Sequence, residues 1–227
     1  MAFPGLAGRV QEVRARIASA VARGGHRQKV TVVAVTKTHG PDAVIAAYEA
    51  GLHDVGENKV QEALKKMGGV DVPVRWHLIG HLQRNKVKSL EQFVLLHSLD
   101  SARLADAVCA FGLDRARAVD ALIEMNLSGE DSKGGFTHSE LLPEAERLTG
   151  LAGIRVRGVM TMASFTASET QLRRTFADAR AALEVLVQAG HPAKELSMGM
   201  SNDYEIAVEE GATMVRIGTT LFGAREK

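Results

Sequence analysis

The chain has 227 residues, and its 28 Lys and Arg side chains against 27 Asp and Glu give a formal charge of +1 when the 8 His are neutral. This near-balance excludes a protein that spreads a basic surface over nucleic acid, and an apolar share of 45% excludes a mainly disordered chain. The single cysteine, Cys109, has no partner for an internal disulfide, which predicts a reducing compartment. Because residues 1–8 carry no leader pattern and no segment approaches the roughly 18 apolar residues of a membrane span, we expect a cytoplasmic protein that does not bind membranes.

The apolar residues follow two periods along the chain. An amphipathic helix comes first, because Leu6, Val10, Val13, Ile17 and Val21 recur at helical spacing. After it, short runs typical of strands buried in a parallel sheet alternate with segments of helical period. In chain order, the expected elements are strand Val30–Thr36, helix Pro41–Ala50, strand His53–Gly56, helix Lys59–Met67, strand Val74–Ile79, helix Arg84–Leu90, strand Phe93–Ser98, helix Ala102–Phe111, strand Ala118–Met125, helix Ser139–Leu148, strand Val156–Met162, a helix that carries Leu172 and Leu186, strand Leu196–Met200, helix Tyr204–Glu210 and strand Met214–Ile217.

This alternation predicts the fold. Eight strands paired with helices at this length are typical of a (β/α)8 barrel, which usually has ~250 residues. We therefore expect an α/β protein, a (β/α)8 TIM-type barrel with an extra N-terminal helix. Residues 1–227 are expected to form a single domain, because no proline-rich linker or charge shift divides them. The alternative is an open doubly wound sheet, which would leave two strand edges to protect.

Lys37 is the first candidate for chemistry. In such a barrel the reactive groups lie at the carboxyl ends of the strands, and Lys37 directly follows the apolar run that begins at Val32. An amine held at an apolar rim loses part of its hydration and becomes a nucleophile that forms a Schiff base with a carbonyl compound. The alternative is a lysine that ends a strand and extends into water.

The last two strand ends carry small residues that suit a phosphate. The segment Met198–Asp203 joins a strand to a helix, and Val215–Thr220 places Gly218 beside two hydroxyls. Small residues let backbone N–H groups approach an anion, and barrels often build phosphate sites from the loops after strands seven and eight. Arg216 lies two residues before Gly218, so strand alternation points it into the barrel, where it needs an internal carboxylate or a ligand atom as acceptor.

The amine of Lys37, the cation of Arg216 and the two small-residue segments, called the phosphate cup below, are together typical of a site for an aldehyde that carries a phosphate. Pyridoxal phosphate fits this description, because an arginine can face its ring nitrogen. A sugar-phosphate aldolase that uses a lysine Schiff base without a cofactor also fits the amine and the cup. Both interpretations remain open on these residues alone.

Several sequence blocks together carry a more specific signal. They are Ala34–Lys37 (AVTK), Gly56–Asn58 (GEN), Trp76–Lys86 (WHLIGHLQRNK), Ser132–Phe136 (SKGGF), Gly158–Met162 (GVMTM), Leu196–Asp203 (LSMGMSND) and Arg216–Gly218 (RIG). In this order, and spread over nearly the whole chain, the blocks resemble the signature of the pyridoxal phosphate homeostasis protein family.

The resemblance implies a barrel of the alanine racemase N-terminal type that binds pyridoxal phosphate as an internal aldimine of Lys37. It implies that Asn58 approaches the cofactor, that Ser201 and its neighbours in the cup hold the phosphate, and that Arg216 faces the pyridine nitrogen. The cofactor-binding residues that we expect on this basis are Lys37, Asn58, Met200, Ser201, Arg216, Gly218 and Thr219.

The resemblance also implies storage and delivery of the cofactor rather than turnover. By this resemblance the chain is a small cytoplasmic protein, most similar members being monomeric, whose proposed role is to keep free pyridoxal phosphate low and available to the enzymes that need it. We expect a monomer that supplies the cofactor to apo-enzymes through transient contact. Arg216 opposite the ring nitrogen would disfavour its protonation and weaken the cofactor as an electron sink. Racemases of related fold use a tyrosine from a second domain, whereas Tyr48 and Tyr204 are expected within or at the start of helices. We expect trace racemase activity at most, and a weak amino-acid racemase is the alternative.

Three other features receive a structural interpretation. His77 and His81 are four residues apart, but the turn at Gly80 separates them and no cysteine or carboxylate accompanies them, so we expect a hydrogen-bonded His77 and no metal site. The basic run Arg84, Lys86 and Lys88 is more typical of a solvated helix face than of a docking surface for partner enzymes. Lys133, which could act as a second amine, is more typical of a surface lysine in a glycine-rich loop.

Overall fold

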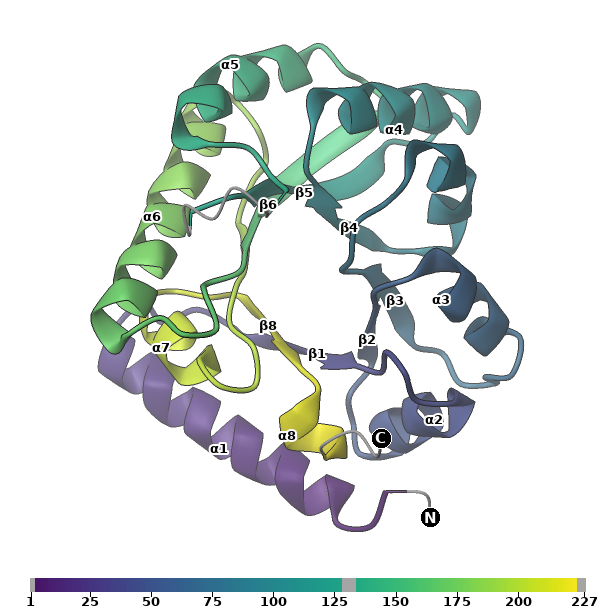
Figure 1. The fold of residues 1–227 in the computed structure, drawn as a ribbon, viewed down its shortest axis with the longest axis vertical. Coiled ribbons are helices and arrows are strands. Elements are labelled where there is room, and N and C mark those ends of the chain that lie inside the picture. The colour runs from purple at the N-terminus through teal and green to yellow at the C-terminus, as the bar shows by residue number, and fades with distance from the viewer. Residues whose placement is uncertain (1–2, 128–133, 224–227) are drawn as a thin grey trace.

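Eight parallel strands form a closed barrel in the computed structural model, and helices surround it (Figure 1). The structure describes residues 3–127 and 134–223. In chain order, the elements are α1 (Leu6–Gly24), β1 (Thr31–Val35), α2 (Pro41–Glu49), β2 (Asp54–Glu57), α3 (Val60–Met67), β3 (Arg75–Leu78), η1 (Arg84–Gln92), β4 (Leu95–Leu99), α4 (Ala102–Asp114), β5 (Val119–Met125), α5 (His138–Thr149), β6 (Ile154–Thr161), α6 (Glu169–Gln188), β7 (Glu195–Ser197), α7 (Tyr204–Glu209), β8 (Met214–Ile217) and α8 (Thr219–Phe222).

The sheet has no free edge, because each strand pairs with the next and β8 pairs with β1. This closure confirms the (β/α)8 barrel with an extra N-terminal helix and rules out the open doubly wound sheet. In a parallel barrel every strand ends at the same rim. Residues that directly follow the strands are therefore brought together, although they lie far apart in sequence.

Most element ends shift by one to three residues from the sequence-based expectation, and three differences have a structural explanation. Strand β7 ends at Ser197 rather than Met200, because Gly199 adopts a φ of +90° and turns the chain. The segment η1 is a 3-10 helix, in agreement with its buried residues Val87 and Leu90, which lie three positions apart. Helix α8 was not predicted, since its four residues are too few to show a helical period.

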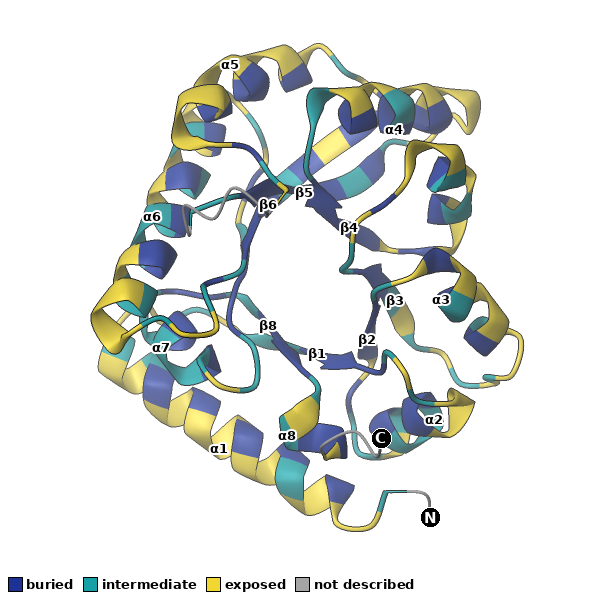
Figure 2. Cartoon of the chain, in the orientation of Figure 1, coloured by how far each residue is buried: buried dark blue, intermediate teal, exposed yellow. Residues whose placement is uncertain are grey.

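The main apolar core lies between the outer face of the barrel and the helices, and Figure 2 shows buried strands inside helices that expose their outer sides. Helix α1 buries Leu6, Val10, Val13 and Ile17, as predicted from their spacing, and packs beside α7 and α8 (Figure 1). No helix within residues 3–127 and 134–223 is both long and apolar enough to cross a membrane.

The interior of the barrel combines a small apolar cluster with a polar wall. The apolar cluster is built on Leu95, Leu122 and Met160. Because side chains alternate along a strand, Glu124 shares the inner face of its strand with Leu122. On the same inner surface, the polar residues of β2, β3, β4, β7 and β8 are Asp54, His77, His97, Ser197 and Arg216, all buried.

Candidate functional site

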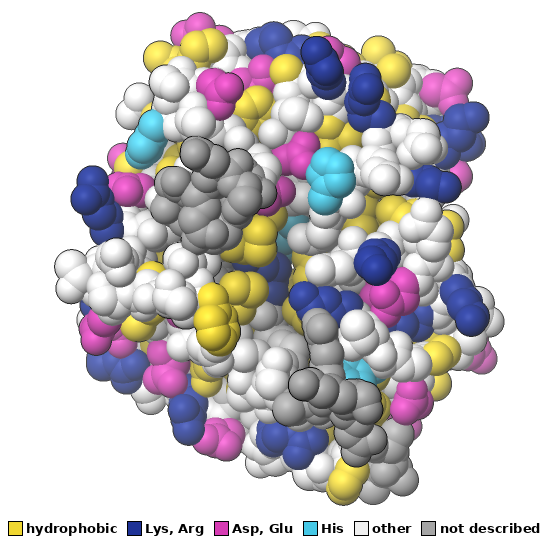
Figure 3. Space-filling model, viewed as in Figure 1, with side chains coloured by type: hydrophobic (Ala, Val, Ile, Leu, Met, Phe, Trp, Pro, Cys, Tyr) yellow, Lys and Arg dark blue, Asp and Glu magenta, His cyan; other side chains and the backbone are white. Residues whose placement is uncertain are grey.

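A cavity of about 790 Å³ opens at the carboxyl ends of the strands. Figure 3 shows the molecule hollowed near the centre of this face, with charged side chains of both signs around the hollow. The cavity brings together every cofactor-binding residue expected from the sequence. They are Lys37 after β1, Asn58 after β2, Met200 and Ser201 after β7, Arg216 within β8, and Gly218 and Thr219 after it.

A buried ion pair lies directly behind Lys37 and Asn58. Lys66 Nζ donates to Glu57 Oε1 at 2.5 Å and to the carbonyl oxygen of Thr36 at 2.8 Å, and Thr36 Oγ1 donates to the same Glu57 oxygen. Burial raises the pKa of Glu57, while Lys66 and Thr36 oppose the rise. Since Thr36 and Glu57 immediately precede Lys37 and Asn58, the pair fixes the strand ends from which both site residues project.

The loop after β3 packs tightly against Asn58. A Cβ atom on Gly80 would lie 2.4 Å from the Asn58 carbonyl oxygen, so no larger residue fits at this position. The close approach of the two backbones sets the wall of the cavity at the end of β2.

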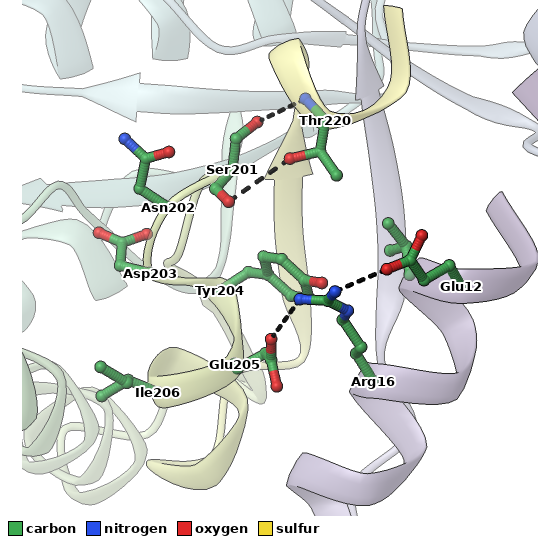
Figure 4. A pocket seen from close by; sticks show the side chains of 10 residues that line it. Glu12, Arg16, Ser201, Asn202, Asp203, Tyr204, Glu205, Ile206 and Thr220 are labelled. Carbon is green, nitrogen blue, oxygen red and sulfur yellow. Dashed lines mark hydrogen bonds and ion pairs between the residues drawn. The ribbon is translucent and has the colours of Figure 1, made fainter. Parts of the chain in front are cut away.

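Ser201 joins the loops after β7 and β8 into one cup. Its hydroxyl oxygen lies 3.3 Å from the N–H groups of both Gly218 and Thr220, and its carbonyl oxygen accepts from the Thr220 hydroxyl at 3.4 Å. Thr219 begins α8, so its N–H has no intrahelical acceptor. Figure 4 shows Ser201 joined to Thr220, with Tyr204 turned toward Arg16 of α1. Hydroxyl and N–H groups gathered in this way suit an anion.

Gly199 is required for the backbone conformation of the loop after β7, which forms one side of this cup. Its φ is +90°, and a Cβ there would lie 2.6 Å from Ala207 Cβ and 2.9 Å from Tyr204 Cα. We expect Gly199→Ala to lower the free energy of unfolding by about 2–4 kcal/mol, through backbone strain and overpacking. Urea unfolding measures this loss, with Gly190→Ala as the control. Gly190 also has a positive φ, +98°, but no heavy atom lies within 4 Å of the position that its added Cβ would take. Equal losses in the two variants would show that packing against α7 does not constrain the cup.

Arg216 is held inside the barrel by backbone and hydroxyl oxygens. Its guanidinium donates to the carbonyl oxygens of Ser197 at 2.7 Å and Thr161 at 2.9 Å, and to Ser197 Oγ at 2.6 Å. Burial lowers its pKa to about 10, although Asp203 and Glu124 oppose the shift. The sequence predicted a carboxylate or a ligand atom as the acceptor. Within the described residues the hydrogen-bond acceptors are carbonyl and hydroxyl oxygens instead of a carboxylate, and a ligand atom as a further acceptor stays a prediction.

A chain of hydrogen bonds continues from Arg216 across the barrel. Ser197 Oγ is 2.8 Å from His97 Nδ1, His97 Nε2 is 2.9 Å from His77 Nδ1, and His77 Nε2 is 3.0 Å from Asp54 Oδ1. Arginine only donates and a carboxylate only accepts, so with both imidazole rings neutral each hydrogen bond in the chain points from Arg216 toward Asp54. Burial lowers the pKa of His97 well below 6.5, so this ring is neutral. The expected structural role of His77 agrees with this geometry.

The opposite wall of the cavity carries charged groups that were not predicted as site residues. His81 Nδ1 lies 2.6 Å from Asp100 Oδ2, and both residues line the cavity together with Glu124. Burial raises the pKa of Glu124 to about 7, and the nearby Asp100 carboxylate adds to this rise. A charged residue in the buried run of β5 was the available sequence signal for Glu124.

The remaining candidates lie elsewhere or outside the described residues. His77 faces the barrel interior and His81 the rim, and the described ranges hold no group of three or more potential metal ligands. Tyr48 packs against His53, with ring centroids 4.9 Å apart, and no tyrosine is among the described residues that line the cavity. Lys133 lies outside the described residues.

The structure places the basic run Arg84, Lys86 and Lys88 on η1 but does not show whether the run has a function. Arg84 and Lys88 are exposed and Lys86 is half-buried. Its interpretation as a solvated face therefore stays a prediction.

Comparison with known proteins identifies relatives over the whole chain. A family model described as alanine racemase, N-terminal domain, matches residues 9–226. The pyridoxal phosphate homeostasis protein of Aquifex aeolicus is 40% identical over 222 residues, which cover 96% of this chain and 97% of that protein. The protein of the same name from Pseudomonas aeruginosa is 39% identical over 224 residues, covering 97% of this chain and 96% of that protein.

Solved structures show the same barrel. PipY of Synechococcus elongatus PCC7942, solved with PLP bound, is 33% identical to this chain and aligns with a TM-score of 0.84 over 96% of this chain and 100% of its own. Alanine racemase from Corynebacterium glutamicum is 16% identical, with a TM-score of 0.73 over 93% of this chain and 61% of that chain. At this lower identity, the likeness shows a shared fold alone.

Proposed function

The chain belongs to the pyridoxal phosphate homeostasis protein family, and from this premise we propose that it binds pyridoxal 5′-phosphate through Lys37 and supplies it to apo-enzymes. The observation that carries the proposal is the convergence in one cavity of an amine, a cup of N–H and hydroxyl groups, and a buried cation. The relative PipY, whose structure contains PLP, supports the same assignment.

The residues of the cavity fit the three functional groups of this cofactor. Lys37 Nζ offers an amine to the aldehyde, and Ser201, Gly218 and Thr219 offer hydroxyl and N–H donors to the phosphate. Arg216 offers a cation and donor to the ring nitrogen, while Asn58 and Met200 complete the walls. When bound, the cofactor supplies a carbonyl carbon that forms a covalent bond with an amine.

Two features favour storage over turnover. Arg216 is cationic and fixed by three oxygens, so a second positive charge on the facing ring nitrogen is disfavoured, and the cofactor is a weaker electron sink. Within the described residues, no tyrosine lines the cavity to act as a second acid or base. We therefore expect racemase activity at trace level at most, to be checked as turnover of L-alanine against free pyridoxal phosphate.

We further propose that this barrel, as a single domain over residues 1–227, is the whole binding unit and acts as a cytoplasmic monomer with transient contacts to recipient enzymes. All proposed binding residues come from one chain. The free thiol of Cys109 is buried as an apolar side chain, which agrees with a reducing compartment.

The proposal is tested by the visible absorption spectrum of the purified protein incubated with pyridoxal phosphate. We expect a chromophore that borohydride traps on the peptide containing Lys37, and its complete loss in Lys37→Ala. Lys65→Ala, on the exposed side of α3, is the control and should load normally. A colourless protein that takes up no added cofactor would overturn the proposal and favour the cofactor-free aldolase.

A further inference from the structure

The proposed cofactor residues occupy only part of the cavity wall. They come from the ends of β1, β2, β7 and β8, whereas the ends of β3, β4 and β5 contribute His81, Asp100 and Glu124. None of these three has a role in holding the phosphate, the ring nitrogen or the carbonyl carbon. The cavity therefore has an acidic side that the proposed function leaves unused.

Glu124 is the most unusual group on this acidic side. It is only 8% exposed, it lines the cavity, and no hydrogen bond from the described residues contributes to its pKa. A buried carboxylate without a donor is costly unless a ligand completes it. Asp100 lies close enough to raise the pKa of Glu124, while Arg216 and His81 lower it. The Glu124 carboxylate is therefore open on the cavity side to a cation with N–H groups.

We propose that Asp100 and Glu124 form a subsite for the ammonium group of a primary alkylamine, such as a lysine side chain of a recipient protein, and that Glu124 takes a proton from this amine before it displaces Lys37. The inference rests on the proposed function and deepens it, because it assigns the residues through which the bound cofactor is passed on. The subsite lines the same cavity as Lys37, so the incoming amine would enter the cavity in which Lys37 holds the carbonyl carbon.

The exchange balances in atoms and charge. Glu124 would remove one proton from the incoming ammonium group, which leaves a nucleophilic amine with two protons. A C=N bond to this nitrogen would replace the C=N bond to Lys37 Nζ, the two remaining protons of the incoming amine would pass to Lys37 Nζ, and Glu124 would return the third, so that Lys37 leaves as an ammonium group. No oxidant or reductant is needed. The raised pKa of Glu124, about 7, suits a group that must both accept and return a proton near neutral pH.

The acidic side also discriminates between kinds of amine. Two carboxylates attract an alkylammonium group but repel an amine that carries its own carboxylate, as in a free amino acid. A lysine side chain within a protein has no such carboxylate. The cavity should therefore release the cofactor to lysine side chains faster than to free amino acids.

The first test measures how fast n-butylamine discharges Lys37 in loaded protein, as the fraction of cofactor that borohydride still traps on the Lys37 peptide in rapidly quenched samples. Rates are taken on the loaded fraction, so a change in loading does not enter the comparison. We expect Glu124→Gln to slow the discharge roughly tenfold or more, and Glu146→Gln, the same change at an exposed position of α5, to leave it unchanged. Equal rates in the Glu124→Gln variant and wild type would overturn the proposal.

The second test needs no variant and so does not depend on how a variant folds. Wild-type protein is discharged with n-butylamine, with Nα-acetyl-lysine amide and with 4-aminobutanoate, at matched concentrations of free amine. We expect the first two to react several-fold faster than the third, and alanine to be slow as well. If 4-aminobutanoate matches n-butylamine, the acidic side does not recognise the amine and the inference fails.

These outcomes are separate from those of the proposed function. A wild-type protein that never forms the chromophore refutes cofactor binding itself. A protein that loads on Lys37, but discharges independently of Glu124 and of the charge on the amine, retains the proposed function and loses only the amine subsite.

Discussion

Lys66→Met is expected to lower the free energy of unfolding by about 3–5 kcal/mol. Lys66 Nζ contacts Glu57 Oε1 at 2.5 Å and the Thr36 carbonyl at 2.8 Å, and the two charged side chains are almost fully buried. Methionine keeps the aliphatic part of the side chain but removes the cation. The Glu57 carboxylate then remains in the interior with Thr36 Oγ1 as its main donor, and this uncompensated charge is the source of the loss.

The size of this loss should depend on pH. Burial raises the pKa of Glu57 above its ordinary 4.5, and Lys66 opposes the rise, so its removal raises the pKa further. When the folded-state pKa exceeds the unfolded value, the folded state binds the proton first, and stability increases as the pH falls through the folded pKa. The deficit of Lys66→Met relative to wild type should therefore shrink on acidification.

Urea unfolding at about pH 8 and about pH 5.5 measures both effects. Lys65→Met, on the exposed side of the same helix, is the matched control and should change stability by less than about 0.5 kcal/mol. The double variant Glu57→Gln with Lys66→Met should recover much of the loss, since no buried charge remains. Equal midpoints for Lys65→Met and Lys66→Met would contradict a stabilising role for the pair.

The sequence predicted those parts of the molecule that local pattern determines. Alternating periods of apolar residues identified the barrel, because each strand and helix must bury one side against the same core. Lys37 and Ser201 were identifiable because a reactive or small residue follows an apolar run, and the barrel fold places all such positions at one rim. The order of the strands around the barrel then brought these residues into one cavity.

Residues whose role depends on contacts between distant elements were not predicted. Glu57 and Lys66 are nine positions apart on a strand and a helix, and only the packing of α3 on the barrel brings their charges together. Asp100 follows an apolar run and Glu124 interrupts one, but the sequence does not show that the two carboxylates lie close together. The carbonyl acceptors of Arg216 were also missed, because the sequence does not show which backbone carbonyl oxygens at the strand ends face a side chain.

His97→Gln is expected to remove a large part of the acid sensitivity of the fold. His97 links Ser197 to His77 inside the barrel, and burial, with smaller contributions from the neighbouring His77 and Arg216, lowers its pKa well below 6.5. The folded protein therefore keeps this ring neutral at pH values where the unfolded chain protonates it. Because the unfolded state binds the extra proton, wild-type stability should fall by about 1.4 kcal/mol per pH unit below about pH 6.5.

Asp54 causes a second loss of stability, at lower pH, and this loss should persist in His97→Gln. Burial raises its pKa, but hydrogen bonds from His77 and Arg75 outweigh this and lower it from 3.8 to about 2. Such a group stabilises the fold above the unfolded pKa, and the contribution is lost as the pH falls from about 4 toward 2. The two groups thus act in different pH ranges.

Unfolding of wild type and His97→Gln by urea between about pH 7 and about pH 4.5 separates these contributions. Glutamine can still donate and accept, so we expect a moderate loss at neutral pH and a flatter dependence below it. His26→Gln, at an exposed position, is the control and should keep the wild-type slope. If His97→Gln is as acid-sensitive as wild type, a neutral His97 does not link Arg216 to Asp54, and the direction assigned to the hydrogen-bond chain is wrong.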